Sequence, residues 1–433
     1  MSRWASEPGM SCRLAGSSGP VPGLANVDES ERRCTPCRGD RPRTAEGVEV
    51  DFRESPEHRD LRDTVRAIAA EFGPEYYVPR AEAGEPTSEL WAKLGSSGFL
   101  GINLPEEYGG GGAGLVELAM VCEETAAAGC PQLLLLVSAA ISGEMIADFG
   151  TPEQKAHYLP RMASGEAKVV FAITEPDAGS NTHRLSTVAR RDGADWVVNG
   201  TKHYISGVDE AEAILLVARS GVDENTGKGK LSLFLVPTDA PGLVRTPLPV
   251  SAKLPEKQFV LHFDDLRLPA EALVGEEHKG FQQVFHGLNP ERITGAAVCV
   301  GVARHVLGRA AEYATTRTVW DVPIGSHQGV AHPLAKARIE TDLAALMTSK
   351  AAWLHDEGLP AGEASNVAKY AAAEAAGAAV EAAIQTHGGN GLATEYGLLP
   401  YWGISRLLRI APVSREMVLN FVAQHSLGLT RSY

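Results

Sequence analysis

The segment "GLNPERITGAA", residues 287–297, places Glu291 directly before Arg292, where an Ala/Gly-rich helical pattern begins. A carboxylate shielded from water has a raised pKa, which suits it to take a proton from a weak carbon acid. The same residues also fit a helix end. Asn289 is a good N-cap, Pro290 suits the first helical position, and an acid in the next position favours the positive end of the helix dipole. Because first-turn acids are common, this segment alone favours the structural interpretation.

Composition limits the class of protein. At 433 residues the chain exceeds what one hydrophobic core usually serves, so two or three packed units are expected. A formal charge of −14 without a basic stripe argues against a nucleic-acid partner, because phosphate contacts need clustered Lys and Arg. The longest apolar run, Leu133–Ile141, is about half a membrane span and predicts a buried helix, not a membrane anchor. The N-terminus does not resemble a secretory signal, so a cytoplasmic protein is the simplest expectation.

The cysteines favour reduced thiols. Three of the six lie in the first forty residues, and Cys122, Cys130 and Cys299 stand in apolar contexts. This distribution suits buried thiols of a cytosolic protein better than a disulfide framework. "CTPC" at 34–37 has metal-ligand spacing, but zinc needs four ligands and no second pair stands nearby, so no metal site is predicted.

The pattern along the chain predicts an α+β multidomain protein. Residues 1–45 are rich in Ser, Gly, Pro and Arg without periodicity, which predicts a disordered tail. Residues 46–165 are helical: Ser55 precedes Pro56 as a cap, and Thr151 pairs with Gln154 as a capping box.

A second change of pattern predicts the remaining domains. Short runs rich in Val, Ile, Leu and Phe fill 166–273, and the absence of crossover helices predicts an antiparallel β-domain. The helical period returns over 274–433 and predicts a second helical domain. The expected helices are 290–317, 333–356, 364–387 and 413–426.

A glycine-rich motif at 109–114, "GGGGAG", satisfies the dinucleotide fingerprint G-x-G-x-x-G. That fingerprint requires a preceding strand and a βαβ unit. The loop "LPEEY" precedes the glycines and a helical pattern follows them, so a Rossmann fold is not predicted.

"FAITEPDAGSNT" at 171–182 resembles the signature of the acyl-CoA dehydrogenase family. Four further segments match in order and spacing: "NGTKHYISG" (199–207), "FDDLRLPAEALVGEEHKGF" (263–281), "RTVWDVPIGSHQGV" (317–330) and "QTHGGNG" (385–391). The resemblance covers roughly residues 50 to 430. It implies a helical N-terminal domain, a middle β-domain and a C-terminal four-helix bundle, which agrees with the blocks inferred from the residue patterns.

The family binds FAD, and the resemblance implies which residues hold it. A flavin ring needs donors at its pyrimidine edge, a hydrogen bond near N5 and an apolar or aromatic wall. Phe171, Ile173 and Thr174 match positions that line the flavin, with the Thr174 hydroxyl donating to the pyrimidine side. Tyr204 stands where most members have tryptophan against the ring, and Ser206 where a threonine hydroxyl meets N5. Taken singly, each residue would also suit ordinary sheet packing.

The resemblance further implies a phosphate site and a second subunit. Arg317 matches an arginine that reaches the FAD pyrophosphate, where a planar, permanently charged fork suits phosphate oxygens. Trp320 stands where relatives have phenylalanine, and Gln328 is a neighbour of that region. Ser180 takes a position that touches the acyl-CoA chain. The segment that meets the FAD of a neighbouring subunit matches Gln385, Gly388 and Gly389. A homodimer is therefore implied, and the family is commonly a homotetramer.

The base departs from the commonest family pattern. Many members use the glutamate of a C-terminal "YEGT" motif, but an ungapped alignment of "RIAPVSREM" (409–417) puts Pro412 there, with neither a carboxylate nor an N–H. The Val413 amide would then replace the missing N–H, and a shifted register would make Glu416 a candidate base. The isovaleryl-CoA and long-chain subgroups carry the base at the position matching Glu291. There, Arg292 would orient the site electrostatically, since its pKa is too high for proton transfer.

These matches imply an FAD-dependent acyl-CoA dehydrogenase of fatty-acid β-oxidation, which oxidises an acyl-CoA to the 2-enoyl-CoA and passes electrons to an electron-transfer flavoprotein. Two alternatives stay open. One is a flavin monooxygenase or oxidase on the same fold. The other is a non-catalytic acyl-CoA- or flavin-binding subunit, which Pro412 and the shortened segment "KLPEKQF" (253–259) would suit.

Overall fold

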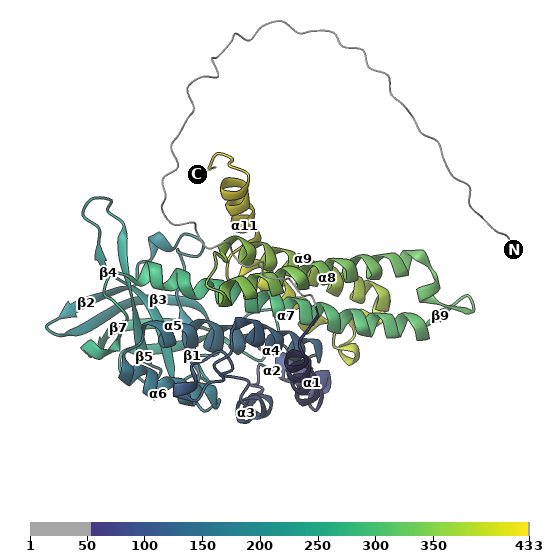
Figure 1. Cartoon of the computed structure of the whole chain (residues 1–433), viewed down its shortest axis with the longest axis horizontal. Helices are drawn as coiled ribbons and strands as arrows, with labels where there is room; N and C mark the ends of the chain where they lie inside the picture. The colour runs from purple at the N-terminus through teal and green to yellow at the C-terminus, as the bar shows by residue number, and fades with distance from the viewer. Residues whose placement is uncertain (1–52, 432–433) are drawn as a thin grey trace, which may run out of the picture. The chain divides into compact units, whose positions relative to one another are not determined.

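Figure 1 shows the computed structural model, which describes residues 53–431 of the chain. Helices precede and follow a large β-sheet, so the predicted order of helical, β and helical domains is confirmed. The predicted tail at 1–45 lies outside the described residues, and the predicted domain boundaries stay predictions. The N-terminal helices are α1 (Pro56–Ala70), α2 (Gly73–Ala83), α3 (Ser88–Ser96), α4 (Leu115–Ala127), the π-helix η2 (Leu135–Gly143), α5 (Glu144–Phe149) and α6 (Pro152–Ala163).

Side-chain caps begin α1 and α6 where the sequence places them. The Ser55 hydroxyl accepts a hydrogen bond from the His58 amide at 3.1 Å. Thr151 and Gln154 form the reciprocal capping box that satisfies two amides at the start of α6. The apolar run at 133–141 is buried and forms most of η2, so the predicted buried helix is confirmed. The glycines at 109–114 lie between a 3-10 turn and α4, and from residue 53 to these glycines the chain forms helices and no strand.

The middle domain is an eight-stranded sheet in the order β6-β7-β3-β2-β4-β5-β8, with β1 also pairing β4. An Asp-Gly turn joins β2 to β3, and Gly193 has a φ of 66°, which favours glycine. The strands are β1 (Val169–Ala172), β2 (Val188–Asp192), β3 (Asp195–Ser206), β4 (Ala213–Val222), β5 (Gly229–Pro237), β6 (Leu243–Leu248), β7 (Gln258–Leu268) and β8 (Leu273–Val274).

Most strand pairs of the sheet are antiparallel, as predicted, but the sheet also contains parallel pairs that the prediction missed. Both β1 and β2 run parallel to β4. The prediction assumed that parallel strands need an intervening crossover helix. Here the crossovers are instead the loop after β1 and the β2–β3 hairpin, which brings the chain back along the sheet.

The C-terminal domain contains the helices α7 (Gly280–Thr316), α8 (Gln328–Asp356), α9 (Gly362–His387), α10 (Leu399–Ile410) and α11 (Arg415–Phe421), followed by the π-helix η8 (Val422–Ser426). A small hairpin of β9 (Thr318–Val319) and β10 (Val322–Pro323) joins α7 to α8. The α9 prediction is accurate to within two residues. The sequence reading missed α10.

Two predicted helix starts are wrong. Helix α7 begins at Gly280, ten residues before the predicted start, and Pro290 lies inside it. Helix α8 begins at Gln328, with Pro333 likewise inside. In both segments proline was interpreted as the first helical residue, whereas the helix continues through it. Asn289 is therefore not an N-cap, and Glu291 does not lie at a helix end.

Two buried apolar clusters meet at β1 and fix its position. Val170 and Ala172 pack with α4, α7 and α9. Val169 and Phe171 point to the opposite cluster, which includes residues from η2, α5 and α6. Leu288, in an early turn of α7, packs against that second cluster. The N-terminal part of α7 therefore packs against the same apolar cluster to which Phe171 belongs.

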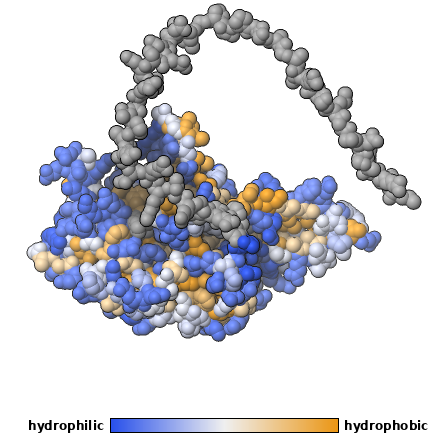
Figure 2. All heavy atoms as spheres, in the orientation of Figure 1, coloured by the Kyte–Doolittle hydropathy of each residue, from blue (hydrophilic) through white to orange (hydrophobic). Residues whose placement is uncertain are grey.

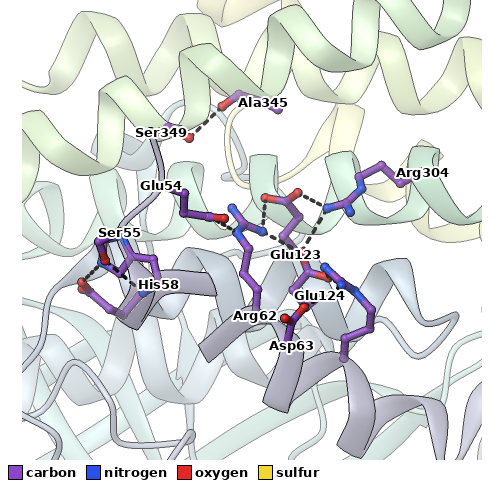
Figure 3. Close-up of polar contacts among 12 residues, drawn as sticks. Glu54, Ser55, His58, Arg62, Asp63, Glu123, Glu124, Arg304, Ala345 and Ser349 are labelled. Carbon is purple, nitrogen blue, oxygen red and sulfur yellow. Dashed lines mark hydrogen bonds and ion pairs between the residues drawn. The ribbon is translucent and has the colours of Figure 1, made fainter. Parts of the chain in front are cut away.

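A charged network ties α1, α4 and α7 together (Figure 3). The Glu124 carboxylate on α4 is fully buried and pairs with Arg62 at 2.7 Å, Arg66 at 2.9 Å and Arg304 at 3.1 Å. Arg62 also contacts Glu123 and Glu54. Because a buried carboxylate is costly without partners, this network fixes α1 against α4 and α7.

Cys122, Cys130 and Cys299 are buried free thiols, as the sequence predicted. The "CTPC" segment lies outside the described residues. Within residues 53–431, none of the helices has the length and apolar character of a membrane span.

Candidate active site

Glu291 lies in the interior of α7, about three turns from its first residue. Its side chain is partly buried, and its carboxylate makes no hydrogen bond or ion pair within the described part of the chain. Burial raises the pKa of Glu291 to about 7, and the charges of Arg292 and Lys369 oppose that rise. A carboxylate that is shielded from water but has no hydrogen-bond donor is suited to accept a proton.

Arg292 is a buried cation, and not all of its N–H donors have a hydrogen-bond acceptor within the described chain. Only 7% of its surface is exposed, and one terminal nitrogen donates to the Asn289 side chain at 2.9 Å. Its Nε finds no partner among residues 53–431. Burial lowers the pKa of Arg292, and the Glu291 charge opposes that change. An arginine stays protonated even so, and the electrostatic role expected of Arg292 stays a prediction.

The turn between α10 and α11 carries no base. Pro412 follows a cis peptide bond and occupies this turn. Glu416 lies in the first turn of α11 with 70% of its side chain exposed, 3.4 Å from Arg415. An exposed carboxylate keeps its water shell, so Glu416 does not fit the role of a shielded base. The Val413 amide N–H has no acceptor within the described chain and is available as a donor.

Lys369 on α9 is a group that sequence reasoning missed. It is 2% exposed and donates to the carbonyl oxygens of Arg409 at 3.3 Å and Val413 at 2.5 Å. Burial lowers its pKa to about 8. From the sequence, a lysine within an alanine-rich helix would be expected at the surface. Its burial becomes visible only when α9 packs against α7 and α10.

The residues predicted to face a flavin gather where the ends of β1 and β3 meet. The His203 amide donates to the Thr174 carbonyl at 2.8 Å, which places Thr174 beside Tyr204 in the fold. Tyr204 has a φ of 59° and leaves 60% of its surface exposed. A strained backbone that presents an aromatic ring to solvent is typical of a binding site. The Ser206 hydroxyl donates to the Gln258 side chain at 3.0 Å.

A buried ion pair between Lys202 and Glu175 stabilises the junction of β1 and β3. The Lys202 ammonium donates to the Ile173 carbonyl at 2.8 Å and to the Glu175 carboxylate at 2.9 Å. Burial opposes ionisation of Glu175, but Lys202 and the amides of Ser186 and Thr187 lower its pKa to about 2. The pair therefore fixes the backbone on both sides of Thr174.

A second site lies at the other end of α7. A pocket of about 330 Å³ brings together four of the predicted residues: Arg317, Gln385, Gly388 and Gly389. A Cβ atom at either glycine would meet no neighbour within 4 Å, so the backbone is open to a ligand. Gly388 also has a φ of 58°, which favours glycine. An exposed guanidinium over open backbone suits a phosphate group.

Three predicted residues lie apart from this pocket. Trp320 is 84% exposed in the β9–β10 hairpin, and Gln328 is exposed at the start of α8. Neither lines the pocket that Arg317 lines. Ser180 is exposed in the loop after β1. The roles expected of these three stay predictions.

Glu291 and Arg317 are far apart along α7. About 25 helical residues separate Glu291 from Arg317, which corresponds to about 38 Å at 1.5 Å per residue. Glu291 and the Arg317 pocket therefore lie at separate places along α7.

Comparisons with known proteins identify the family of this chain. The profiles of the acyl-CoA dehydrogenase N-terminal, middle and C-terminal domains match residues 55–166, 170–266 and 278–427. Acyl-CoA dehydrogenase FadE12 of Mycobacterium tuberculosis is 57% identical over 388 residues, which cover 89% of this chain and 100% of that protein. The chain belongs to the acyl-CoA dehydrogenase family.

Other acyl-CoA dehydrogenases are similar over most of their length. The mitochondrial long-chain specific enzyme of Sus scrofa is 31% identical over 371 residues, with 86% of each chain covered. A structure of glutaryl-CoA dehydrogenase from Mycobacterium smegmatis in complex with FADH2 has a TM-score of 0.82 at 28% identity. It covers 88% of this chain and 96% of that one.

Acyl-CoA dehydrogenases are FAD-dependent oxidoreductases, and the residues present fit that cofactor. The β1–β3 junction offers the hydroxyls of Thr174 and Ser206 beside an exposed aromatic ring. The far pocket offers a guanidinium over glycine backbone. These groups match the needs of a flavin ring and of a pyrophosphate, respectively.

Proposed function

We propose that this chain catalyses α,β-dehydrogenation of an acyl-CoA thioester, with Glu291 as the base and electron-transfer flavoprotein as the electron acceptor. The observation that carries the proposal is the partly buried, unpaired Glu291 carboxylate, whose pKa burial raises to about 7. It lies one turn after Leu288, which packs against the apolar cluster that contains Phe171.

The chain's own residues would supply proton transfer and charge stabilisation. An unpaired Glu291 Oε would accept the α-proton of the thioester. The Val413 N–H would donate to the thioester oxygen and stabilise the negative charge that develops there. The buried positive charge of Arg292 would favour ionised Glu291 before the proton moves. Bound FAD would supply the acceptor for the hydride that leaves the β-carbon.

The flavin-binding residues would hold the cofactor at one end. Phe171 and Ile173 would provide the apolar wall, and Tyr204 the aromatic one. The hydroxyls of Thr174 and Ser206 would bond to the pyrimidine edge and near N5. Ser180 would touch the acyl-CoA chain from the loop after β1.

A second copy of the chain would complete the cofactor site. Because Arg317 lies about 38 Å along α7 from Glu291, the pyrophosphate pocket would serve the FAD of another subunit. Gln385, Gly388 and Gly389 line the same pocket and would belong to that shared site, with Trp320 and Gln328 flanking it.

The exposed face of α8 supports assembly into a homodimer or homotetramer. Ile339, Leu343 and Leu346 are each more than half exposed and follow helical spacing. Figure 2 shows apolar surface along this part of the bundle. An apolar stripe of this kind marks an interaction surface in soluble proteins.

Anaerobic bleaching tests the proposed function. Purified protein with bound FAD is mixed with straight, branched and aromatic acyl-CoAs, and flavin absorbance is followed. Loss of the oxidised flavin spectrum with at least one thioester is the expected result. Reoxidation by electron-transfer flavoprotein, but not rapidly by air, supports a dehydrogenase.

Two other outcomes would replace the proposal. Rapid reoxidation by oxygen in the presence of substrate would indicate an oxidase or monooxygenase. Bound FAD that no acyl-CoA bleaches would indicate a non-catalytic binding subunit.

A further inference from the structure

We propose that Lys369 is a positioning residue of the active site, which holds the α10–α11 turn against α9 and acts on Glu291 as a buried positive charge. The inference rests on the proposed function, because it assigns Lys369 to the carboxyl that acts as base there. Lys369 lies 78 positions after Glu291 in the sequence and on a different helix, α9.

A lysine at this depth needs an explanation. Lys369 is 2% exposed in a helix whose other buried positions are mostly alanine. Burying an ammonium group is unfavourable unless acceptors or opposite charges compensate. An apolar side chain would fill the same space at lower cost in folding free energy. The retained charge therefore indicates a role beyond packing.

The contacts of Lys369 form a clamp across Pro412. Its ammonium donates to the carbonyl of Arg409, in the last turn of α10, and to that of Val413 beyond the proline. Terminal helix carbonyls lack intrahelical partners and carry the negative end of the helix dipole, so a cation there is stabilising. The two hydrogen bonds hold the chain on either side of the Pro412–Val413 peptide, whose N–H is free to donate.

The charges around this clamp connect it to the base. Glu291, Arg292 and Cys299 on α7 and Glu416 on α11 act electrostatically on Lys369. The groups that act on Glu291 are Arg292 and Lys369. An opposite charge favours ionisation of a carboxyl, so Lys369 counters the effect of burial on the pKa of Glu291. Without Lys369, Arg292 alone would oppose burial.

A simpler role for Lys369 is to cap α10 and nothing more. Both roles predict that removing the ammonium lowers stability. They differ in the titration of Glu291, which a cap alone would leave unchanged. The titration of that one carboxyl is therefore the decisive readout.

Infrared difference spectroscopy of the FAD-bound protein reads this titration without substrate. The carboxyl band of Glu291 is assigned by subtracting spectra of Glu291→Gln and is followed from acid to alkaline pH. Lys369→Met is compared with Lys369→Arg, which keeps the charge, and with Lys336→Met, which removes a lysine 77% exposed on α8. Thermal unfolding and FAD content establish that each variant is folded.

Lys369→Met is expected to raise the midpoint of Glu291 by about one pH unit, because a neighbouring opposite charge is lost. Lys369→Arg is expected to restore most of that shift, and Lys336→Met to leave the midpoint unchanged. The acid limb of flavin reduction by an acyl-CoA should move upward in Lys369→Met by the same amount. If Lys369→Met does not fold, Lys369→Gln, which is uncharged but keeps a donor, takes its place with the same expected shift.

An unchanged Glu291 midpoint in a folded, uncharged Lys369 variant would overturn the inference. Failure of the proposed function is a separate result. It would be seen as flavin that no acyl-CoA bleaches, or as bleaching of Glu291→Gln at the wild-type rate, while the infrared titration would still report the effect of Lys369.

Discussion

The Lys369 ammonium on α9 donates a hydrogen bond to the carbonyl of Val413, immediately after Pro412. This contact anchors the turn in which many acyl-CoA dehydrogenases carry their base, although here the turn contains no carboxylate. The unpaired carboxylate lies instead on α7, at Glu291. The proposed base and the turn therefore come from different segments of the C-terminal domain.

The rate of flavin reduction should depend on pH through Glu291. A base must be deprotonated to act, and burial raises the pKa of Glu291 to about 7. We therefore expect the rate of bleaching by acyl-CoA to fall as pH drops below about 7 and to level off above it. Stopped-flow absorbance across pH 5 to 9 measures this profile. A rate that stays flat down to pH 5 would argue against a carboxyl with a raised pKa.

Glu291→Gln should stabilise the fold at alkaline pH. The folded pKa of Glu291 lies above its unfolded value, so the native state holds an extra proton between those two values. Stability from this group is therefore lost as pH rises from about 4.5 to about 7. Because Gln carries no charge to bury, we expect the variant's Tm to exceed that of wild type at pH 8 and to match it near pH 4.5. Equal Tm differences at both pH values would contradict this expectation.

Glu124→Gln should destabilise the fold without altering the base. Glu124 is fully buried and pairs with three arginines (Figure 3), so the substitution removes the buried counter-charge that they share. We expect a loss of about 3 kcal/mol in the free energy of unfolding, measured by urea denaturation. Asp63→Asn is the matched control, since Asp63 is 72% exposed and should change stability by at most about 0.5 kcal/mol. Similar losses in both variants would show that the network adds little.

Leu343→Glu should weaken both assembly and cofactor binding. Leu343 is 62% exposed in the middle of the apolar stripe on α8, and a buried interfacial charge is unfavourable. Since the Arg317 pocket would serve another subunit, a smaller assembly should also release FAD. Light scattering after size-exclusion chromatography, with flavin absorbance, measures both properties. Lys228→Glu, an exposed change in the β4–β5 loop, should affect neither, and an unaltered mass for Leu343→Glu would exclude the stripe as an interface.

Periodicity and caps predicted much of the fold because they are local signals. The hydroxyls of Ser55 and Thr151 accept hydrogen bonds from amides in the first turns of α1 and α6, as predicted. Two prolines led to wrong predictions of where α7 and α8 begin. Pro290 and Pro333 looked like first helical residues, but tertiary packing carries α7 and α8 through them. The parallel pairing of β1 with β4 was missed, since no local pattern reports which distant strand a segment meets.

The candidate site was only partly predictable for the same reason. Glu291 was recognisable from its position before Arg292 and from the missing carboxylate at Pro412. Lys369 was not, because its role comes from contacts with residues about 40 positions away. The Lys202–Glu175 pair under Thr174 likewise depends on the meeting of two strands. Contacts between residues so far apart in the sequence cannot be recognised from the spacing of residue types.

The rate of flavin reduction in Glu291→Gln is the most direct test of the base. Wild type, Glu291→Gln and Glu416→Gln are each loaded with FAD, mixed anaerobically with the best acyl-CoA and followed by stopped-flow absorbance. Removing a general base is expected to slow Glu291→Gln by a factor on the order of 10² to 10⁴. The exposed Glu416 should be replaceable with little effect. Glu291→Gln that keeps its FAD and bleaches at the wild-type rate would contradict the assignment.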